Sequence, residues 1–373
     1  MRERSGVGFE VQRPLPGLDH MAALSDDVGI IQHAVYDVPN RATGYCTDDV
    51  ARALIVAIAA SEHAATREQA LILGRRYLAF LLDAELPDGR FHNFMSYARA
   101  WLDDCGTGDS IGRAIWAIGY AVRFAPLATW CDVSRRLLAN ALPHAAKLQH
   151  VRSRAYAALG LAQARAALGP EGGSALEPSL RAIGDDLVAR HARFARADWD
   201  WFEDEFTYDN ARLPEALLRI GTVLDDRRYV TLGLQTLAFY ESIVIEGDIF
   251  VPIGNAGWYR RGHERARLAQ QPLEAASLID VALAAETASG DARYRTLAQT
   301  GLAWFYGRNT LGAALVHGGG CCDGLEADGP NRNMGAESTL AYLAAAFALA
   351  PADAAALRIA RKVAARSFSA EPG

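Results

Sequence analysis

Three short stretches of this sequence each place an aspartate three or four residues before an arginine. The pairs are Asp49/Arg52, Asp109/Arg113 and Asp209/Arg212. Residues at these spacings share one face of a helix, so each pair would lie on the first turn of a helix. Any single pair is explained by a helix cap with an ion pair, because aspartate complements the positive end of the helix dipole. Several such pairs facing one cavity would instead form a ring of carboxylates, which indicates ligand binding or proton transfer.

Two glutamates, Glu274 and Glu337, each lie about one turn inside an apolar segment. Buried carboxylates are rare without a partner, and a structural bond to a neighbouring helix is the alternative interpretation. The candidate catalytic set is therefore Asp48, Asp49, Asp109, Asp209, Glu274 and Glu337.

Large aromatic and hydrogen-bonding residues gather in the segments 88–94, 198–208 and 252–263. Exposed loops seldom carry so many aromatics unless these pack or bind a ligand. Tryptophan and tyrosine suit the apolar C–H faces of pyranose rings, whereas packing explains Phe94, Phe202 and Phe206. The candidate substrate-binding residues are Tyr45, Arg52, His92, Arg113, Trp201, Tyr208, Asn210, Arg212, Trp258, Gln271 and Asn333.

The elements that must position these residues read as helices, because apolar residues recur at three- and four-residue spacing in Ala-, Leu- and Arg-rich segments. The predicted helices span 47–62, 66–84, 109–124, 130–147, 151–168, 177–196, 209–223, 227–243, 271–289, 292–307, 335–349 and 353–368. Segments such as 51–60 are apolar all round, as buried helices are, and others such as 68–82 are amphipathic.

The connections between these helices alternate between short and long, except near His150, where the link is almost absent. Short links join antiparallel neighbours, so the long loops all leave from one side. This pattern predicts an all-α (α/α)6 toroid of six helical hairpins, with the first helix of each pair inside. An open helical solenoid is the competing architecture. We expect one catalytic domain over 25–373, preceded by an N-terminal extension over 1–24.

These helix starts resemble the six-hairpin glycosidase superfamily. The resemblance covers about residues 25–368 and is carried by the segments 47–53 (TDDVARA) and 201–216 (WFEDEFTYDNARLPEA). It implies a toroid fold, a carbohydrate substrate and a site in the mouth at the inner helix ends, but it does not select one member family.

Glycoside hydrolysis with inversion is the leading hypothesis for the reaction. It needs a carboxylic acid and a carboxylate separated by roughly 6.5–9.5 Å. Asp109 and Asp209 are predicted on the second and fourth inner helices, so a cavity can separate them. The sequence does not decide which carboxylate is the acid.

Three alternatives stay open. A sugar epimerase or isomerase commonly uses a histidine pair, and His33, His92, His263 and His317 lie in long loops. A zinc site at 317–323 has suitable ligand types but matches no standard spacing, so neither metal nor cofactor is expected. A catalytically degenerate carbohydrate-binding protein is the third.

The composition sets further limits. A formal charge of −6 without a basic run argues against nucleic acid or an anionic membrane as partner. The five cysteines show no repeated spacing, and no apolar signal segment or membrane-length span is present. We therefore expect a cytoplasmic protein with an oligosaccharide substrate, of unspecified oligomeric state.

Overall fold

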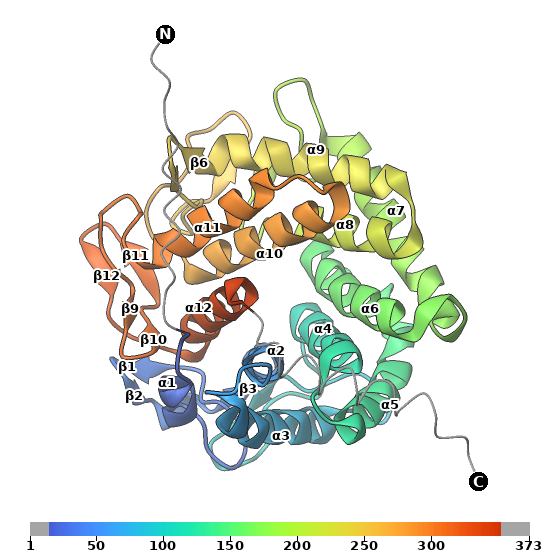
Figure 1. Cartoon of the computed structure of the whole chain (residues 1–373), viewed down its shortest axis with the longest axis vertical. Coiled ribbons are helices and arrows are strands. Elements are labelled where there is room, and N and C mark those ends of the chain that lie inside the picture. Colours follow the sequence, from blue (N-terminus) through green and yellow to red (C-terminus); the bar gives the residue numbers. More distant parts are fainter. Residues whose placement is uncertain (1–14, 352–373) are drawn as a thin grey trace.

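The computed structural model describes residues 15–351, which form a ring of helices around a central axis (Figure 1). The helices are α1 (Asp19–Ala23), α2 (Thr47–Ala60), α3 (Arg67–Ala84), α4 (Gly108–Phe124), α5 (Ala128–Ala145), α6 (Val151–Gly172), α7 (Glu177–Phe194), α8 (Arg212–Leu224), α9 (Arg227–Val244), α10 (Pro272–Ser289), α11 (Arg293–Phe305) and α12 (Ala336–Leu349), with 3-10 turns η1 (Arg41–Thr43) and η2 (Ser174–Leu176).

Six of these helices form a closed inner barrel. Going round the ring, α2 contacts α4, and the contacts continue through α6, α8, α10 and α12 back to α2. The helices α3, α5, α7, α9 and α11 lie outside them. The predicted (α/α)6 toroid is thus confirmed, and closure of the ring excludes the open solenoid. The last predicted helix, 353–368, lies outside the described residues.

The inner helices approach closely where they lack side chains. A Cβ atom on Gly119 of α4 would lie 2.1 Å from the carbonyl oxygen of Gly160 in α6, and one on Gly160 would lie 2.1 Å from the carbonyl oxygen of Ile115. Neither distance is possible for real atoms. The two glycines therefore allow α4 and α6 to pack backbone against backbone, which narrows this side of the barrel.

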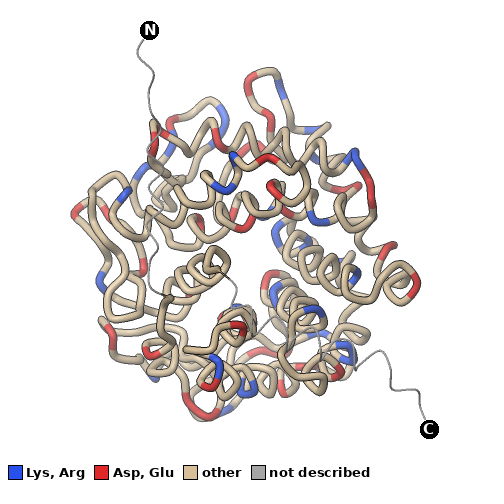
Figure 2. The backbone as a smooth tube through the Cα atoms, in the orientation of Figure 1, with Lys and Arg blue, Asp and Glu red and all other residues tan. Residues whose placement is uncertain are grey.

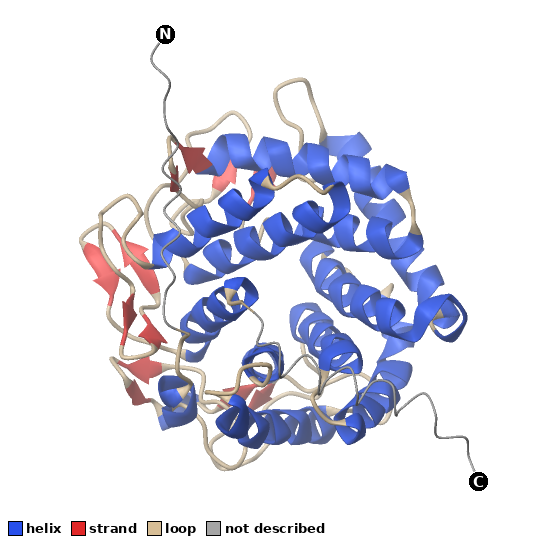
Figure 3. Ribbon diagram, viewed as in Figure 1, coloured by secondary structure: helices blue, strands red, loops and turns tan. Residues whose placement is uncertain are grey.

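The long loops carry only short strands within the described residues (Figure 3). They are β1 (Ala34–Val35), β2 (Val38–Pro39), β3 (Tyr45–Cys46), β4 (Phe94–Met95), β5 (Glu205–Phe206), β6 (Ile245–Glu246), β7 (Ile249–Phe250), β8 (Tyr259–Arg260), β9 (Val316–His317), β10 (Gly320–Cys321), β11 (Gly324–Glu326) and β12 (Gly329–Asn331). Two antiparallel pairs, β3 with β4 and β5 with β8, join loops that belong to different hairpins. These pairs fix the loops around the rim.

The segment just before residue 25 belongs to the toroid. Leu18, Met21 and Leu24 of the α1 region are buried in the main core. The His20 ring also contacts the Met334 carbonyl oxygen, with Nε2 at 2.9 Å, next to the start of α12. These apolar side chains pack with the toroid core directly before the expected boundary at residue 25, which stays a prediction.

Charged residues lie on the outer surface and also around the inside of the ring (Figure 2). Both signs are interspersed over the outside, in line with the modest formal charge of −6. Among the described helices, none is both long and apolar enough to span a membrane.

Candidate functional site

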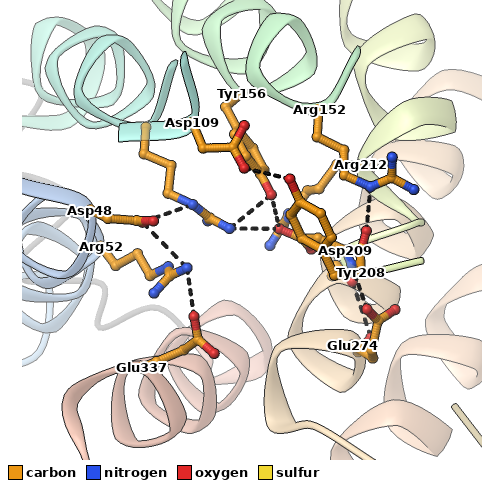
Figure 4. Close-up of polar contacts among 12 residues, drawn as sticks. Asp48, Arg52, Asp109, Arg152, Tyr156, Tyr208, Asp209, Arg212, Glu274 and Glu337 are labelled. Atoms are coloured by element: carbon orange, nitrogen blue, oxygen red, sulfur yellow. Dashed lines mark hydrogen bonds and ion pairs between the residues drawn. The ribbon is translucent and has the colours of Figure 1, made fainter. Parts of the chain in front are cut away.

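Arg52 links the first and last inner helices at their amino ends (Figure 4). Its guanidinium lies 3.3 Å from Asp48 and 2.9 Å from Asp49 of α2, and 2.8 Å from Glu337 of α12. The carboxylates of Asp48 and Glu337 remain partly open, with side chains 26% and 44% exposed. These two acids can therefore meet a ligand, whereas Asp49 is buried.

Arg113 of α4 extends this network across the ring. Its Nε lies 2.8 Å from Asp48, and its Nη2 lies 3.0 Å from Asp209 and donates to the Tyr156 hydroxyl at 2.8 Å. The guanidinium also lies 3.9 Å from the centre of the Tyr156 ring. Burial lowers the Arg113 pKa, but the neighbouring acids Asp48 and Asp209 outweigh it, so the pKa is raised and the side chain stays charged.

Asp209 is held from several sides and is 0% exposed. It precedes α8 with a left-handed backbone (φ 49°), which is why this helix begins at residue 212 and not at 209. Its carboxylate accepts the Tyr156 hydroxyl at 2.7 Å and pairs with Arg212 at 3.2 Å. Burial alone would raise the Asp209 pKa, yet Arg212 and Arg113 hold it below its usual value.

Glu274 of α10 lies directly beneath Asp209 and accepts that residue's backbone N–H. The Tyr240 hydroxyl donates to its other oxygen at 3.3 Å. Burial, followed by the charge of Asp209, raises the Glu274 pKa to about 8. Burial likewise raises the pKa of Asp49 to about 6, although Arg52 opposes it. Glu274 is therefore protonated at neutral pH, and both acids are screened from solvent.

Asp109 lies at the start of α4 and is partly exposed. It accepts hydrogen bonds from the Ser153 hydroxyl and, at 2.5 Å, from the Tyr208 hydroxyl. Trp258, also partly exposed, lies beside Tyr208 with ring centres 6.5 Å apart. Hydroxyl donors therefore hold both oxygens of the Asp109 carboxylate.

Arg152 of α6 fixes the loop that carries Tyr208. It pairs with Glu203 at 2.8 Å, donates to the Asn210 side chain at 3.0 Å and also donates to the Tyr208 carbonyl oxygen. Asn210 is itself fully buried, so its polar atoms hold the loop and do not face the mouth.

The aspartates do not cap their helices. The α2 cap is the Cys46 side chain, which accepts the Asp49 backbone N–H, and the α4 cap is Thr107, which accepts that of Ser110. The ion pairs expected within Asp49/Arg52 and Asp209/Arg212 are present, whereas Arg113 pairs with acids from other helices. Most of these carboxylates therefore bridge helices.

Four predicted binding residues lie outside this network. The Tyr45 hydroxyl donates to Asp26 at 2.6 Å, His92 contacts Asp103 and stacks on Trp101, and Asn333 accepts the Tyr36 backbone N–H. Gln271 is the half-buried residue before α10. The Tyr45, His92 and Asn333 side chains are thus held by bonds within or between the rim segments.

Trp201 differs most from the sequence-based expectation of an aromatic platform. It is 0% exposed and stacks on Phe206, with ring centres 4.3 Å apart. The segment 198–208 folds its apolar rings into the core and leaves Tyr208 at the surface. Burial of so large a ring explains this placement, because it removes apolar area from water.

Five residues of the network were not among the predicted site residues, namely Arg152, Ser153, Tyr156, Glu203 and Tyr240. The third inner helix lacks an aspartate at its start, so its sequence gave the weakest signal. The four-residue spacing of Arg152 and Tyr156 on an apolar helix could have indicated a shared polar face.

A cavity of about 350 Å³ occupies the barrel below this network. Arg52, Arg113, Arg212 and Glu337 border it on the side of the amino ends, and Trp116 and Tyr120 line it further in. The network thus forms one wall of a cavity inside the ring. Within residues 15–351 no group of three or more His, Cys, Asp or Glu residues could hold a metal ion.

Comparison with solved structures gives the relationship of this arrangement to known proteins. A cellobiose 2-epimerase from Bacillus thermoamylovorans matches with a TM-score of 0.66 and 13% identity, over 89% of this chain and 96% of that one. The chain shares this fold. A sugar epimerase from a ruminal bacterium matches with a TM-score of 0.65 and 12% identity, over 87% and 93%.

A GH76 α-mannanase from Bacteroides thetaiotaomicron also matches, with a TM-score of 0.58 and 10% identity, over 89% of this chain and 93% of that one. No protein-family model matches this sequence, and a search of curated proteins found no match. At these identities the comparisons establish the fold, as the resemblance to six-hairpin enzymes implied.

Proposed function

We propose that this protein is a carbohydrate-active enzyme that cleaves a glycosidic bond of an oligosaccharide at the amino ends of its inner helices. The observation that carries this proposal is the set of partly exposed carboxylates of Asp48, Asp109 and Glu337. They come from three inner helices. Asp48 and Glu337 both pair with Arg52, and Asp109 accepts hydrogen bonds from Ser153 and Tyr208. The enzymes that share the fold, named as mannanases, cellulases and sugar epimerases, agree with a saccharide substrate.

Asp109 suits the role of the base that takes a proton from the attacking water. Its two hydroxyl donors fix the orientation of the carboxylate, and its partial exposure leaves room for water. The acid that protonates the leaving oxygen would be one of the other two open carboxyls, Asp48 or Glu337. Water then adds to the anomeric carbon as the glycosidic bond breaks. The base takes one proton from this water, and the acid gives one proton to the leaving oxygen.

Asp209, the other half of the pair that the sequence suggested, suits a positioning role better. Its carboxylate is inaccessible and is used in bonds to Arg113, Arg212 and Tyr156. Such bonds would hold the cationic wall of the site in place without contact to the substrate.

Epimerisation is the second candidate, because the two epimerases match with the higher TM-scores. That reaction commonly uses histidines as proton carriers. In the described part of the chain, no histidine forms a hydrogen bond or ion pair with Asp48, Asp109, Asp209, Glu274 or Glu337. A network made of carboxylates without a histidine favours hydrolysis by a pair of carboxyl groups over epimerisation.

The test is product analysis with gluco- and manno-oligosaccharides in heavy water. Hydrolysis shortens the oligosaccharide, whereas epimerisation keeps its length and introduces deuterium at carbon. We expect shortened products, and Asp109→Asn should reduce turnover at least 100-fold, a typical contribution of a general base. The matched control is Asp132→Asn on outer helix α5, an exposed acid far from the network in the fold. Full turnover by Asp109→Asn would refute the assigned role.

A further inference from the structure

The barrel cavity extends well beyond the proposed catalytic network. It begins at Arg52 and Glu337, near the amino ends of α2 and α12, and reaches Glu62 and Ala350, which follow the carboxyl ends of the same helices. Its volume of about 350 Å³ lies within the usual range of small-molecule sites. Native interiors are otherwise close-packed, so a space of this size calls for an occupant.

The far half of this cavity combines aromatic faces with polar groups. Trp116 and Tyr120 line one side from successive turns of α4. Asp280 of α10 and Arg219 of α8 line other sides, with side chains 23% and 27% exposed. A purely hydrophobic ligand would leave these charged groups without water, so the lining suits a ligand with both apolar faces and hydroxyls.

Tyr120 lines the same cavity as Glu62, Asp280 and Arg219. Burial raises the Tyr120 pKa, the charges of Glu62 and Asp280 add to this rise, and those of Arg219 and Arg123 oppose it. Within residues 15–351 neither the Tyr120 hydroxyl nor the Glu62 carboxylate forms a hydrogen bond. Within the described residues, the Tyr120 hydroxyl and the Glu62 carboxylate can therefore each form hydrogen bonds to a ligand in the cavity.

We propose that this far half of the cavity is a binding site for a neutral saccharide unit, separate from the proposed catalytic carboxylates. Trp116 and the ring of Tyr120 supply apolar contact to the C–H groups of the sugar, and the Tyr120 hydroxyl and Glu62 bind its hydroxyls. The chemistry is that of aromatic stacking plus directional hydrogen bonds in a concave pocket. The proposal concerns binding alone and does not depend on hydrolysis.

The experiment measures saccharide binding in an Asp109→Asn background, so that turnover cannot interfere. Cellobiose, mannobiose and their trisaccharides are titrated by calorimetry and by tryptophan fluorescence. We expect at least one to bind, and Tyr120→Phe and Glu62→Gln each to weaken Kd fivefold or more. Trp116→Phe should remove most of the fluorescence change.

The matched control is Glu68→Gln, an exposed glutamate on outer helix α3, which should leave Kd unchanged. Tyr120→Phe removes one unbonded oxygen, so its circular dichroism melting curve should match that of the parent protein. The proposal is overturned if none of these sugars binds, or if binding is lost with Glu337→Gln and unaffected by Tyr120→Phe and Glu62→Gln. The first outcome would leave hydrolysis of longer chains possible, so the two proposals fail separately.

Discussion

At the scale of single residues, Glu274 and Asp209 are in direct contact, yet their pKa values are shifted in opposite directions. Asp209 has two arginine partners, which lower its pKa, whereas Glu274 has only a backbone N–H and a tyrosine hydroxyl. Burial therefore dominates for Glu274 and raises its pKa to about 8. The contact is favourable because only one of the two acids is ionised.

This difference predicts a pH dependence of stability. The folded state binds the Glu274 proton more tightly than the unfolded state, whose pKa is 4.5, so its contribution is complete below pH 4.5 and is lost as pH rises to about 8. Glu274→Gln should remove this loss. Between pH 5 and 8 the unfolding free energy of the parent should fall by on the order of 3 kcal/mol relative to the variant. Urea titrations at both pH values measure it, and parallel curves for parent and variant would contradict it.

At the scale of elements, α4 and α6 depend on two glycines that face each other. Gly119 and Gly160 lie in helix interiors, where glycine is normally unfavourable. Their close contact brings Trp116 and Tyr156 onto adjacent walls, with parallel rings 6.2 Å apart. The packing of these helices thus sets the position of both Tyr156 in the network and Trp116 in the cavity.

Gly119→Ala is expected to destabilise the fold, although alanine is the better helix former. The new methyl group would overlap the Gly160 carbonyl oxygen, so the helices must separate at a cost of about 1–3 kcal/mol. The matched control is Gly172→Ala at the end of α6, where the nearest heavy atom to an added Cβ is 3.6 Å away. Thermal melting compares the two, and an equally stable Gly119→Ala protein would show that the contact is not tight.

At the scale of the whole molecule, closure of the ring joins the first inner helix, α2, to the last described one, α12. Arg52 of α2 reaches Glu337 of α12, and His20 before α2 contacts the Met334 carbonyl oxygen. In a closed ring every inner helix packs between two neighbouring inner helices. An open stack instead leaves its two end helices with a neighbour on one side only. The position of Glu337, a candidate for the catalytic acid, therefore depends on closure of the ring.

Arg52→Gln tests this link. It leaves Asp49 buried without its cation and frees Glu337, which should lower the unfolding free energy by about 1–3 kcal/mol and reduce turnover. The control is Arg99→Gln, which removes an exposed pair with Asp27 and should change neither quantity. Denaturant unfolding and oligosaccharide turnover measure the two effects. Unchanged values for Arg52→Gln would contradict the proposed importance of this link.

Much of the architecture could be predicted because it follows from local patterns in the sequence. The three- and four-residue apolar spacing located the described inner and outer helices to within a few residues. The exception at Asp209 arose from a left-handed residue that the helical pattern does not reveal. The candidate site was harder, because Trp201 and Tyr208 belong to one loop and only packing separates the buried ring from the exposed one.

The sequence by itself determined the helices, their order in the ring and the acids at their amino ends, since periodicity and loop length are properties of neighbouring residues. Only the tertiary structure decided which acids are open, which arginine each one meets and where the cavity lies. Arg113, for example, sits four residues from Asp109 yet pairs with Asp48 and Asp209. Such partners come from distant parts of the chain, and their pKa values follow from burial that no local pattern contains.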